Sequence, residues 1–384
     1  MRIFFSVGEP SGDVHGANLI RALQALEPGV ECVGFGGDRM ADAGCKHLFD
    51  MCNHAVMGLT QVLSSLPKLI GLVREADRYF QEHRPDAVVL IDYPGFNWWI
   101  ARAAHRQGIP VYYFVPPQIW AWARWRVRKM RRFVDHVLCS LPFEEAWYRE
   151  RGVNAEYVGH PFFDELPRQR FDPLFMETQR NLGGTIIGLL PGSRTHEVEF
   201  NFPMQLRAAE IIHRAHPETR FLVACFKEKH REMMETTRRQ FPGLPLELCV
   251  NRTPEIIELS KACVSVSGSV SLELLYRAKP TVIVFRVSVL TAIIFRPLLR
   301  VKYITLVNLL ADKMLFPEFL TMKCESVGVA REILHWLDDE KSYAGACREL
   351  LALRQQVAMP GACERAALRI VDAINEKKTI PLAA

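Results

Sequence analysis

Residues 2–13, with the sequence RIFFSVGEPSGD, place a run of apolar residues directly before a turn that contains two glycines. A short buried strand, a glycine turn and a helix form the opening unit of a doubly wound α/β domain. The same order returns at residues 186–194, IIGLLPGSR, about half-way along the chain. The two copies predict two Rossmann-like domains, each built on a doubly wound parallel sheet, facing a central cleft.

Strand-like and helix-like segments alternate through both halves, which is typical of parallel sheets covered by helices on both faces. The expected strands are Ile3–Val7, Ala87–Ile91, Val111–Val115, Val134–Cys139, Ile186–Leu190, Phe221–Ala224, Ala262–Val266 and Thr281–Phe285. The expected helices are Ala17–Leu26, Leu59–Phe80, Trp98–Arg106, Glu144–Glu150, Pro203–Ala215, Lys227–Gln240, Pro254–Leu259 and Val270–Arg277.

We expect three parts in the chain, because 384 residues are too many for one typical domain. Residues 1–170 form the first domain and residues 180–340 the second, with a proline- and glycine-containing linker region at 162–184. Residues 341–384 form a helical tail that packs back on the N-terminal domain or on a partner chain.

Bulk composition indicates a globular protein that is cytosolic or peripherally bound to a membrane. The net charge of +5 is mild and does not by itself favour nucleic acid. Ten cysteines without a Cys-x-x-Cys pair suit buried thiols in a reducing compartment. The first residues lack the features of a signal peptide, and no apolar run reaches the roughly 18 residues of a membrane span.

Two loops of the first half follow expected strands. In Gly8–Asp13, glycines let the backbone approach a ligand, although helix capping by Ser11 or Asp13 explains the pattern equally well. In Asp92–Asn97, a carboxylate stands at the carboxyl end of a buried strand, where desolvation would raise its pKa toward that of a general base. The alternative is that Asp92 caps the helix ahead of Pro94.

Two loops of the second half have the composition of phosphate sites. Gly192, Ser193 and Arg194 combine a glycine turn with a cation that can neutralise a leaving phosphate. Ser267, Gly268 and Ser269 form a small-residue loop, and Glu273 lies one turn into the next helix, within reach of ribose hydroxyls. An ordinary turn with a surface arginine and a capping box are the respective alternatives.

Two segments have features of membrane surfaces. Apolar residues recur at helical spacing along 59–73, with Pro67 expected to kink the helix; the ones we assign to membrane contact are Val62, Leu63, Leu66, Leu69 and Ile70. Residues 124–132 hold six basic residues in nine and follow Trp120 and Trp122, which suits anionic headgroups and, less specifically, RNA. Core packing and a solvated helix face are the plainer explanations.

Taken in order, these motifs make the chain resemble the lipid-A-disaccharide synthase family. The resemblance spans some 320 residues through Phe5–Asp13, Gly36–Met40, Val56–Gly58, Asp92–Asn97, Gln118–Trp122, Leu141–Glu144, Val158–Pro161, Leu190–Arg194, Ser267-Gly268, Asn308–Ala311 and Pro317-Glu318. It implies the GT-B glycosyltransferase architecture. Pro116, Ser269 and Pro67 depart from the family pattern.

The resemblance further implies transfer of 2,3-diacylglucosamine from UDP to 2,3-diacylglucosamine 1-phosphate, giving a β(1→6) disaccharide. Asp92 matches the proposed general base, and Arg194 and Asn308 match positions around the donor. We assign Ser11, Gly12, Asp13, Asn97 and Trp120 to acceptor binding. The expected reaction uses no metal and no cofactor, and the expected partner is the inner leaflet of the bacterial inner membrane, with no nucleic acid.

Several alternatives stay open. His15, beside the first loop, is a rival base. A UDP-N-acetylglucosamine 2-epimerase, a muramyl-lipid N-acetylglucosaminyltransferase and a non-catalytic nucleotide-sugar-binding scaffold are the rival functions. A homodimer is compatible with the sequence.

Overall fold

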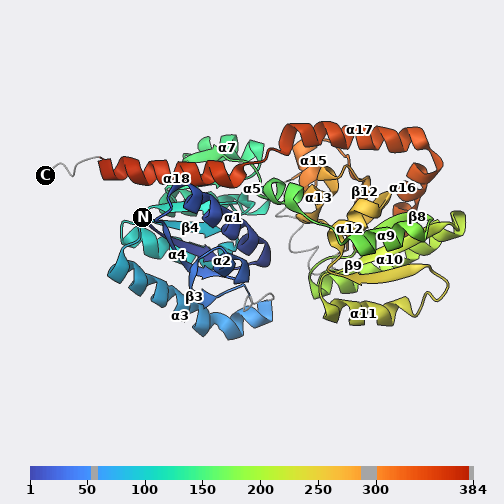
Figure 1. Cartoon of the computed structure of the whole chain (residues 1–384), viewed down its shortest axis with the longest axis horizontal. Helices are drawn as coiled ribbons and strands as arrows, with labels where there is room; N and C mark the ends of the chain where they lie inside the picture. The colour runs from blue at the N-terminus through green and yellow to red at the C-terminus, as the bar shows by residue number, and fades with distance from the viewer. Residues whose placement is uncertain (53–58, 287–300, 380–384) are drawn as a thin grey trace. The chain divides into compact units, whose positions relative to one another are not determined.

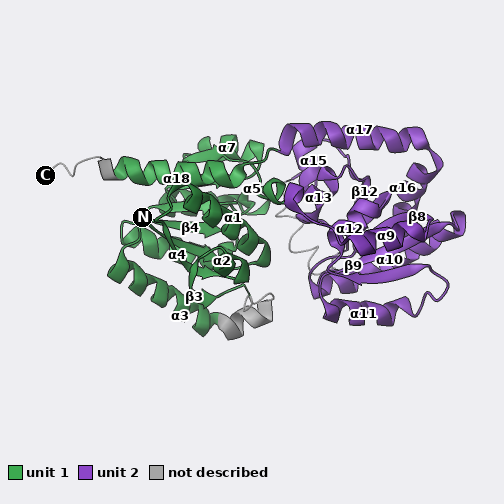
Figure 2. Ribbon diagram, viewed as in Figure 1, with its two compact units in different colours: residues 1–165, 359–384 green, residues 166–358 purple. Residues whose placement is uncertain are grey.

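The computed structural model describes residues 1–52, 59–286 and 301–379, which divide into two compact units (Figure 2). Unit 1 comprises Met1–Glu165 together with Met359–Ala384, and unit 2 comprises Leu166–Ala358. Each unit is built around one parallel sheet, so the predicted α/β class with two Rossmann-like domains is confirmed.

Unit 1 contains a seven-stranded parallel sheet in the order β3-β2-β1-β4-β5-β6-β7. Its strands are β1 Arg2–Val7, β2 Glu31–Gly36, β3 Lys46–Asp50, β4 Ala87–Ile91, β5 Val111–Phe114, β6 His136–Cys139 and β7 Ala155–Tyr157. The two central strands are the most apolar: every residue of β4 is buried, and β1 is buried after Arg2. Burial on both faces explains why these strands are continuous apolar runs without alternation.

Helices cover both faces of this sheet (Figure 1). The helices of unit 1 are α1 Pro10–Leu26, α2 Asp38–Asp42, α3 Leu59–His83, α4 Pro94–Arg106, α5 Ile119–Trp122, η1 Arg124–Arg126, α6 Val127–Phe133, α7 Pro142–Arg149, α8 Phe162–Glu165 and α18 Ala362–Thr379. α3, α4, α6 and α7 share one core with the sheet, and α1, α2 and α18 share the other.

The chain returns to unit 1 through α18, which packs beside α1 (Figure 1). Asp164 fastens the start of this helix, because its carboxylate accepts hydrogen bonds from the backbone N–H groups of Gly361, Ala362 and Cys363 at 2.6–3.1 Å. The boundary at 341 that we expected for the tail therefore differs from the structure: α17 belongs to unit 2, and only the last helix joins unit 1. An apolar stripe on α18 completes the α1 core, whereas α17 packs on α13 and α16.

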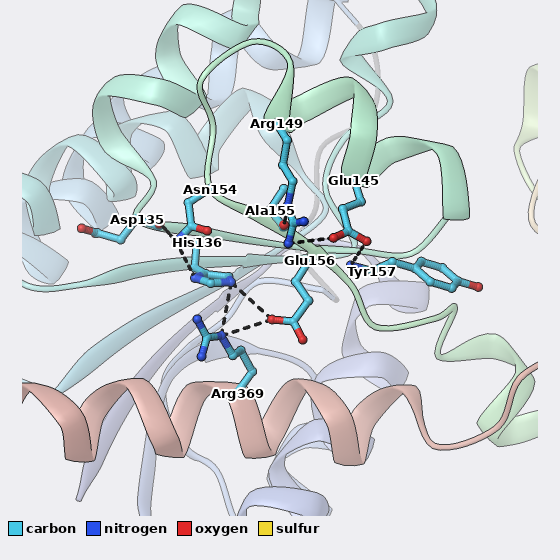
Figure 3. A network of polar contacts seen from close by, with 9 residues as sticks. All are labelled: Asp135, His136, Glu145, Arg149, Asn154, Ala155, Glu156, Tyr157 and Arg369. Atoms are coloured by element: carbon cyan, nitrogen blue, oxygen red, sulfur yellow. Dashed lines mark hydrogen bonds and ion pairs between the residues drawn. The ribbon is translucent and has the colours of Figure 1, made fainter.

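A polar network ties α18 to the edge of the sheet as well (Figure 3). Arg369 pairs with Glu156 at 3.2 Å and donates to His136 Nε2 at 3.5 Å. Burial, and then the charge of Arg369, lower the pKa of His136. A neutral imidazole at this position accepts the arginine N–H, so the network fits the uncharged histidine.

Unit 2 contains a six-stranded parallel sheet in the order β10-β9-β8-β11-β12-β13. Its strands are β8 Thr185–Leu190, β9 Thr219–Cys225, β10 Leu246–Val250, β11 Ala262–Ser265, β12 Thr281–Arg286 and β13 Glu318–Thr321. Its helices are η2 Leu166–Arg168, α9 Pro173–Asn181, α10 Thr195–Ala215, α11 Glu228–Arg238, α12 Thr253–Leu259, α13 Val270–Tyr276, α15 Leu306–Ala311, α16 Ser326–Asp338 and α17 Glu340–Val357.

The region expected as a linker, 162–184, contains regular structure. Asp172 caps α9 by accepting from the N–H groups of Leu174 and Phe175, and Pro173 occupies the first helical position. Proline at that position costs no hydrogen bond, so the residue that suggested a loop is a helix start. No helix in the described part of the chain is long and apolar enough to cross a membrane.

Candidate functional site

The loop after β1 packs against the loop after β4. A Cβ atom at Gly8 would lie 2.3 Å from Cδ1 of Tyr93, so only glycine allows this approach. α1 begins at Pro10, which places Ser11, Gly12 and Asp13 in its first turn. Ser11 is exposed and Gly12 is buried. The carboxylate of Asp13 accepts from the N–H groups of Gly37, Arg39 and Met40 at 2.9–3.2 Å, so it holds the start of α2.

Asp92 lies half-buried at the carboxyl end of β4, in an unusual backbone conformation. Asp92 and Tyr93 both adopt the left-handed region, with φ of 47° and 44°. For non-glycine residues this conformation costs about 1–3 kcal/mol each and concentrates at functional sites. The carbonyl of Asp92 accepts from Asn97 Nδ2 and from the Tyr113 hydroxyl, both at 2.7 Å.

The buried side chain of Asn97 holds the Asp92 loop in place through hydrogen bonds. It is fully buried; its side-chain amide also donates to the carbonyls of Ser6 and Ile91 at 3.2 Å, and its oxygen accepts from the Ser6 hydroxyl at 2.7 Å. The side chain that we assigned to the acceptor thus bridges β1 and β4 and supports the conformation of Asp92.

Trp120 is buried and bound to a carboxylate in the first turn of α7. Its indole N–H donates to Glu144 Oε1 at 2.9 Å, and Glu144 Oε2 accepts from the N–H groups of Ser140 and Leu141 at 3.1 and 3.0 Å. Burial raises the pKa of Glu144 to about 7. The motif containing Glu144 was visible in the sequence, but its link to Trp120 was not.

His15, the rival base, is buried on α1 and oriented by a carboxylate. Its Nδ1 lies 3.1 Å from Glu165 Oε1, and the His160 ring packs edge-on at 5.9 Å between centroids. Burial, and then the neighbouring His15, lower the pKa of His160 to about 3, so that ring stays neutral. A carboxylate–imidazole pair is suited to proton transfer, but also to a satisfied buried histidine.

In unit 2, the loop after β8 is closed by Glu197, a residue to which the sequence assigned no role. Its Oε2 accepts from the N–H groups of Ser193 and Arg194 at 3.1 and 3.2 Å, and its Oε1 accepts from Arg194 Nη1 at 3.1 Å. Gly192 has a φ of 121°, and a Cβ there would lie 2.6 Å from Glu197. These two amides therefore bind a carboxylate already, and the half-exposed guanidinium of Arg194 retains further donors for an anion.

The loop after β11 presents small, exposed residues. Gly268 and Ser269 are exposed, while the Ser267 hydroxyl donates to the carbonyl of Ile304 at 2.8 Å. Glu273 is buried and pairs with Arg277 at 3.1 Å, which also pairs with Glu258. The acidic residue that we expected to contact ribose is thus directed into an ion-pair network.

Asn308 is fully buried, and its side chain is saturated by the protein. Its amide donates to the Phe316 carbonyl at 2.7 Å and to Glu318 Oε1 at 2.8 Å. Its oxygen accepts from the N–H groups of Leu315 and Phe316. Asn308 and Glu318 thus fix the segment before β13. Asn308 could contact the UDP-sugar directly only by giving up some of these hydrogen bonds.

The apolar stripe of α3 divides between surface and core. Leu66 and Ile70 are 47% and 44% exposed, whereas Leu69 packs partly buried against the core. Val62 and Leu63 belong to α3, but their side chains lie outside the described residues. The helix is continuous through Pro67.

Comparison with known proteins places the chain in a family. A family model described as lipid-A-disaccharide synthetase matches residues 3–368. The lipid-A-disaccharide synthase of Anaeromyxobacter sp. (strain K) is 36% identical over 375 residues, covering 96% of this chain and 97% of the relative. That of Myxococcus xanthus (strain DK1622) is 36% identical over 381 residues, covering 97% of each.

Solved structures share the architecture at lower identity. A Staphylococcus aureus MnaA–UDP co-structure aligns with a TM-score of 0.70 at 14% identity, covering 97% of each chain. MurG of Acinetobacter baumannii aligns with a TM-score of 0.57 at 12% identity, covering 97% of this chain and 99% of that one. These likenesses concern the fold alone. From the near-complete match to the family model and to its relatives, we conclude that the chain belongs to the lipid-A-disaccharide synthase family.

Proposed function

We propose that this chain transfers 2,3-diacylglucosamine from UDP to the 6-hydroxyl of 2,3-diacylglucosamine 1-phosphate, forming a β(1→6) disaccharide 1-phosphate and UDP. One observation carries the proposal: the match to lipid-A-disaccharide synthases runs from residue 3 to residue 368 and therefore includes both units. An activity that belongs to the whole two-unit protein is the simplest reason for a match of that extent.

In the proposed mechanism Asp92 takes the proton of the acceptor hydroxyl. The oxygen of that hydroxyl forms a bond to the anomeric carbon of the donor, and the bond from this carbon to the diphosphate oxygen breaks. One displacement inverts the anomeric configuration. The half-buried position of Asp92 at the end of β4, in a strained loop held by Asn97, supports this role.

Arg194 stabilises the departing UDP in this proposal. Its guanidinium is half-exposed, and one of its N–H donors is oriented by Glu197, so the remaining donors can reach phosphate oxygens. Gly192, Ser193 and the exposed Gly268 and Ser269 would allow close approach of the nucleotide. Ser267, Glu273 and Asn308 would then act by shaping their loops, since their side chains are engaged within the protein. We propose that neither a metal nor a cofactor takes part.

On the acceptor side, the exposed Ser11 is the first-turn residue best placed to contact a ligand. Gly12, Asp13, Asn97 and Trp120 would contribute through the positions of the surrounding loops, because all four are buried.

We further propose that the protein binds the inner leaflet of the bacterial inner membrane peripherally, where its acylated substrates reside. Leu66 and Ile70 support this placement, because they are exposed one turn apart on α3 and an amphipathic helix can insert such side chains into a bilayer. The same residues disfavour a 2-epimerase, because an enzyme with a water-soluble sugar nucleotide as substrate needs no apolar contact with a membrane. A homodimer is compatible with this arrangement.

The test is to incubate the purified chain with UDP-2,3-diacylglucosamine and 2,3-diacylglucosamine 1-phosphate in detergent, with and without a chelator. Mass spectrometry should detect UDP and the disaccharide phosphate in equal amounts under both conditions. UDP release without disaccharide would indicate another acceptor. UDP binding without turnover would favour a different UDP-sugar reaction, to be checked with UDP-N-acetylglucosamine as sole substrate.

A further inference from the structure

The segment 94–133 has an extreme charge composition that the proposed reaction does not use. It contains eight arginine and lysine residues and no aspartate or glutamate. These cations are Arg102, Arg106, Arg124, Arg126, Arg128, Lys129, Arg131 and Arg132. Since the whole chain has a net charge of only +5, the remainder is net negative, and the positive charge is concentrated in this one segment.

The fold collects these cations on one side of unit 1. α4 packs against α3 and α6, and the buried faces of α4 and α6, including Trp98, Ile100 and Met130, point into the core that they share with the sheet. The opposite faces are solvent-exposed and carry the cations. We call the exposed arginines, lysine and tryptophans of α4, η1 and α6 the α4–α6 surface; they are Trp99, Arg102, Arg106, Arg124, Trp125, Arg128, Lys129, Arg131 and Arg132.

Most of this charge is not neutralised locally. Arg106 pairs with Asp77 of α3 at 3.2 Å. Arg128, Arg131 and Arg132 have no carboxylate within ion-pair distance in residues 1–52, 59–286 and 301–379. Unpaired like charges within one short helix repel each other, so this composition disfavours the isolated surface and favours an anionic partner.

Two exposed indoles lie among these cations. Trp99 on α4 is 57% exposed and Trp125 on η1 is 56% exposed. Tryptophan prefers the boundary between water and hydrocarbon, where its ring is apolar and its N–H can still be hydrated. The neighbouring α3 adds the exposed aliphatic side chains of Leu66 and Ile70. A nucleic acid could pair its phosphates with the cations and stack its bases on the indoles, but it has no apolar region in which the aliphatic side chains would be buried.

We propose that the α4–α6 surface binds the anionic headgroups of a phospholipid bilayer, with Trp99 and Trp125 entering the interfacial layer. This surface supplies the electrostatic part of binding, and α3 supplies the aliphatic part. The proposal builds on the proposed membrane association of the enzyme, but it does not depend on which sugar is transferred.

The test is sedimentation with vesicles of phosphatidylcholine alone or with one-third phosphatidylglycerol, at low and high salt. The wild-type chain should prefer the anionic vesicles, and salt should weaken this preference. The triple variant Arg128→Gln/Arg131→Gln/Arg132→Gln should bind them about 100-fold more weakly, since each cation near an anionic surface contributes about fivefold.

A matched control is Arg239→Gln/Lys323→Gln/Arg348→Gln, which removes the same charge from exposed positions of unit 2. It should bind nearly as the wild type does. Equal losses in both triples, an unchanged first triple, or equal wild-type binding to both kinds of vesicle would overturn the proposal, as would binding to a homopolymeric RNA in preference to anionic vesicles.

Turnover separates this proposal from the proposed reaction. With substrates dissolved in detergent, the α4–α6 triple variant should match the wild-type rate. If the wild type shows no disaccharide synthesis but binds anionic vesicles through these arginines, the proposal for the α4–α6 surface is supported and the proposed reaction is rejected. If synthesis occurs and the triple variant binds vesicles normally, the reaction stands and the surface assignment fails.

Discussion

The backbone at Asp92 and Tyr93 is left-handed, although neither residue is glycine. Asn97, Tyr113 and the absence of a Cβ at Gly8 together maintain it. Substitution of Asp92 by Asn keeps the size of the side chain but removes the base. We expect kcat to fall by about 10²–10⁴-fold while UDP affinity stays within twofold, because the donor is assigned to the other unit. Steady-state kinetics and calorimetry with UDP check this.

His15→Gln is the comparison that separates the two candidate bases. It should retain most of the activity, since His15 is buried and already paired with Glu165. The opposite pattern, an active Asp92→Asn enzyme and an inactive His15→Gln enzyme, would transfer the role to His15.

Glu197 offers a second prediction for single residues. Its carboxylate fixes two loop amides and the Arg194 guanidinium, so Glu197→Ala leaves three donors without their acceptor. We expect about tenfold weaker UDP binding in calorimetry, because Arg194 is no longer oriented. Glu199→Ala, at an exposed position two residues further along α10, should have no effect. Tighter UDP binding by the Glu197 variant would instead mean that its carboxylate competes with the nucleotide for the loop amides.

Between elements, Glu144 joins the start of α7 to Trp120 of α5. Its pKa is raised to about 7 in the folded chain, above the ordinary value of an unfolded glutamate. The folded state therefore binds the extra proton, and its stabilising effect is complete below about pH 4.5 and is lost as the pH rises through 7.

Glu144→Gln removes this titration. In denaturant unfolding between pH 5 and 8, the stability of the wild type relative to the variant should decline with rising pH, by an amount on the order of 2–3 kcal/mol. A stability difference that does not change with pH would show that Glu144 titrates normally.

At the scale of the whole molecule, the two units differ in chain continuity. Unit 2 is one uninterrupted segment, whereas unit 1 needs α18, Ala362–Thr379, to cover α1. Truncation after Ala358 removes α18 with its buried apolar stripe, so the α1 face becomes exposed. We expect unit 1 to unfold at lower denaturant concentration and unit 2 to retain UDP binding. Tryptophan fluorescence and calorimetry distinguish this from a single concerted unfolding, which would contradict it.

The amino-acid sequence alone determined the fold class, because short continuous apolar runs alternate with helical patterns, which is typical of a parallel sheet covered on both faces. It also located the loops after β1, β4, β8 and β11. It did not predict β2, where Gly34 and Gly36 weaken the strand pattern, nor any of the four edge strands β3, β7, β10 and β13. Several helices begin earlier than expected, because Pro10 and Pro94 occupy first helical positions rather than loops.

Only the tertiary structure decided what the polar residues of those loops contact. Asp13 and Asn97 bind backbone groups of segments far along the chain, and Glu144 binds the distant Trp120 indole as well as the N–H groups at its own helix start. Glu197 and Asn308 bind backbone groups within eight residues of themselves. A sequence motif indicates that a polar side chain stands at a strand end. A ligand and a buried backbone amide, however, compete for the same oxygen or nitrogen atom of that side chain. Which of the two it meets depends on how close the surrounding backbone approaches, and that distance exists only in the folded chain.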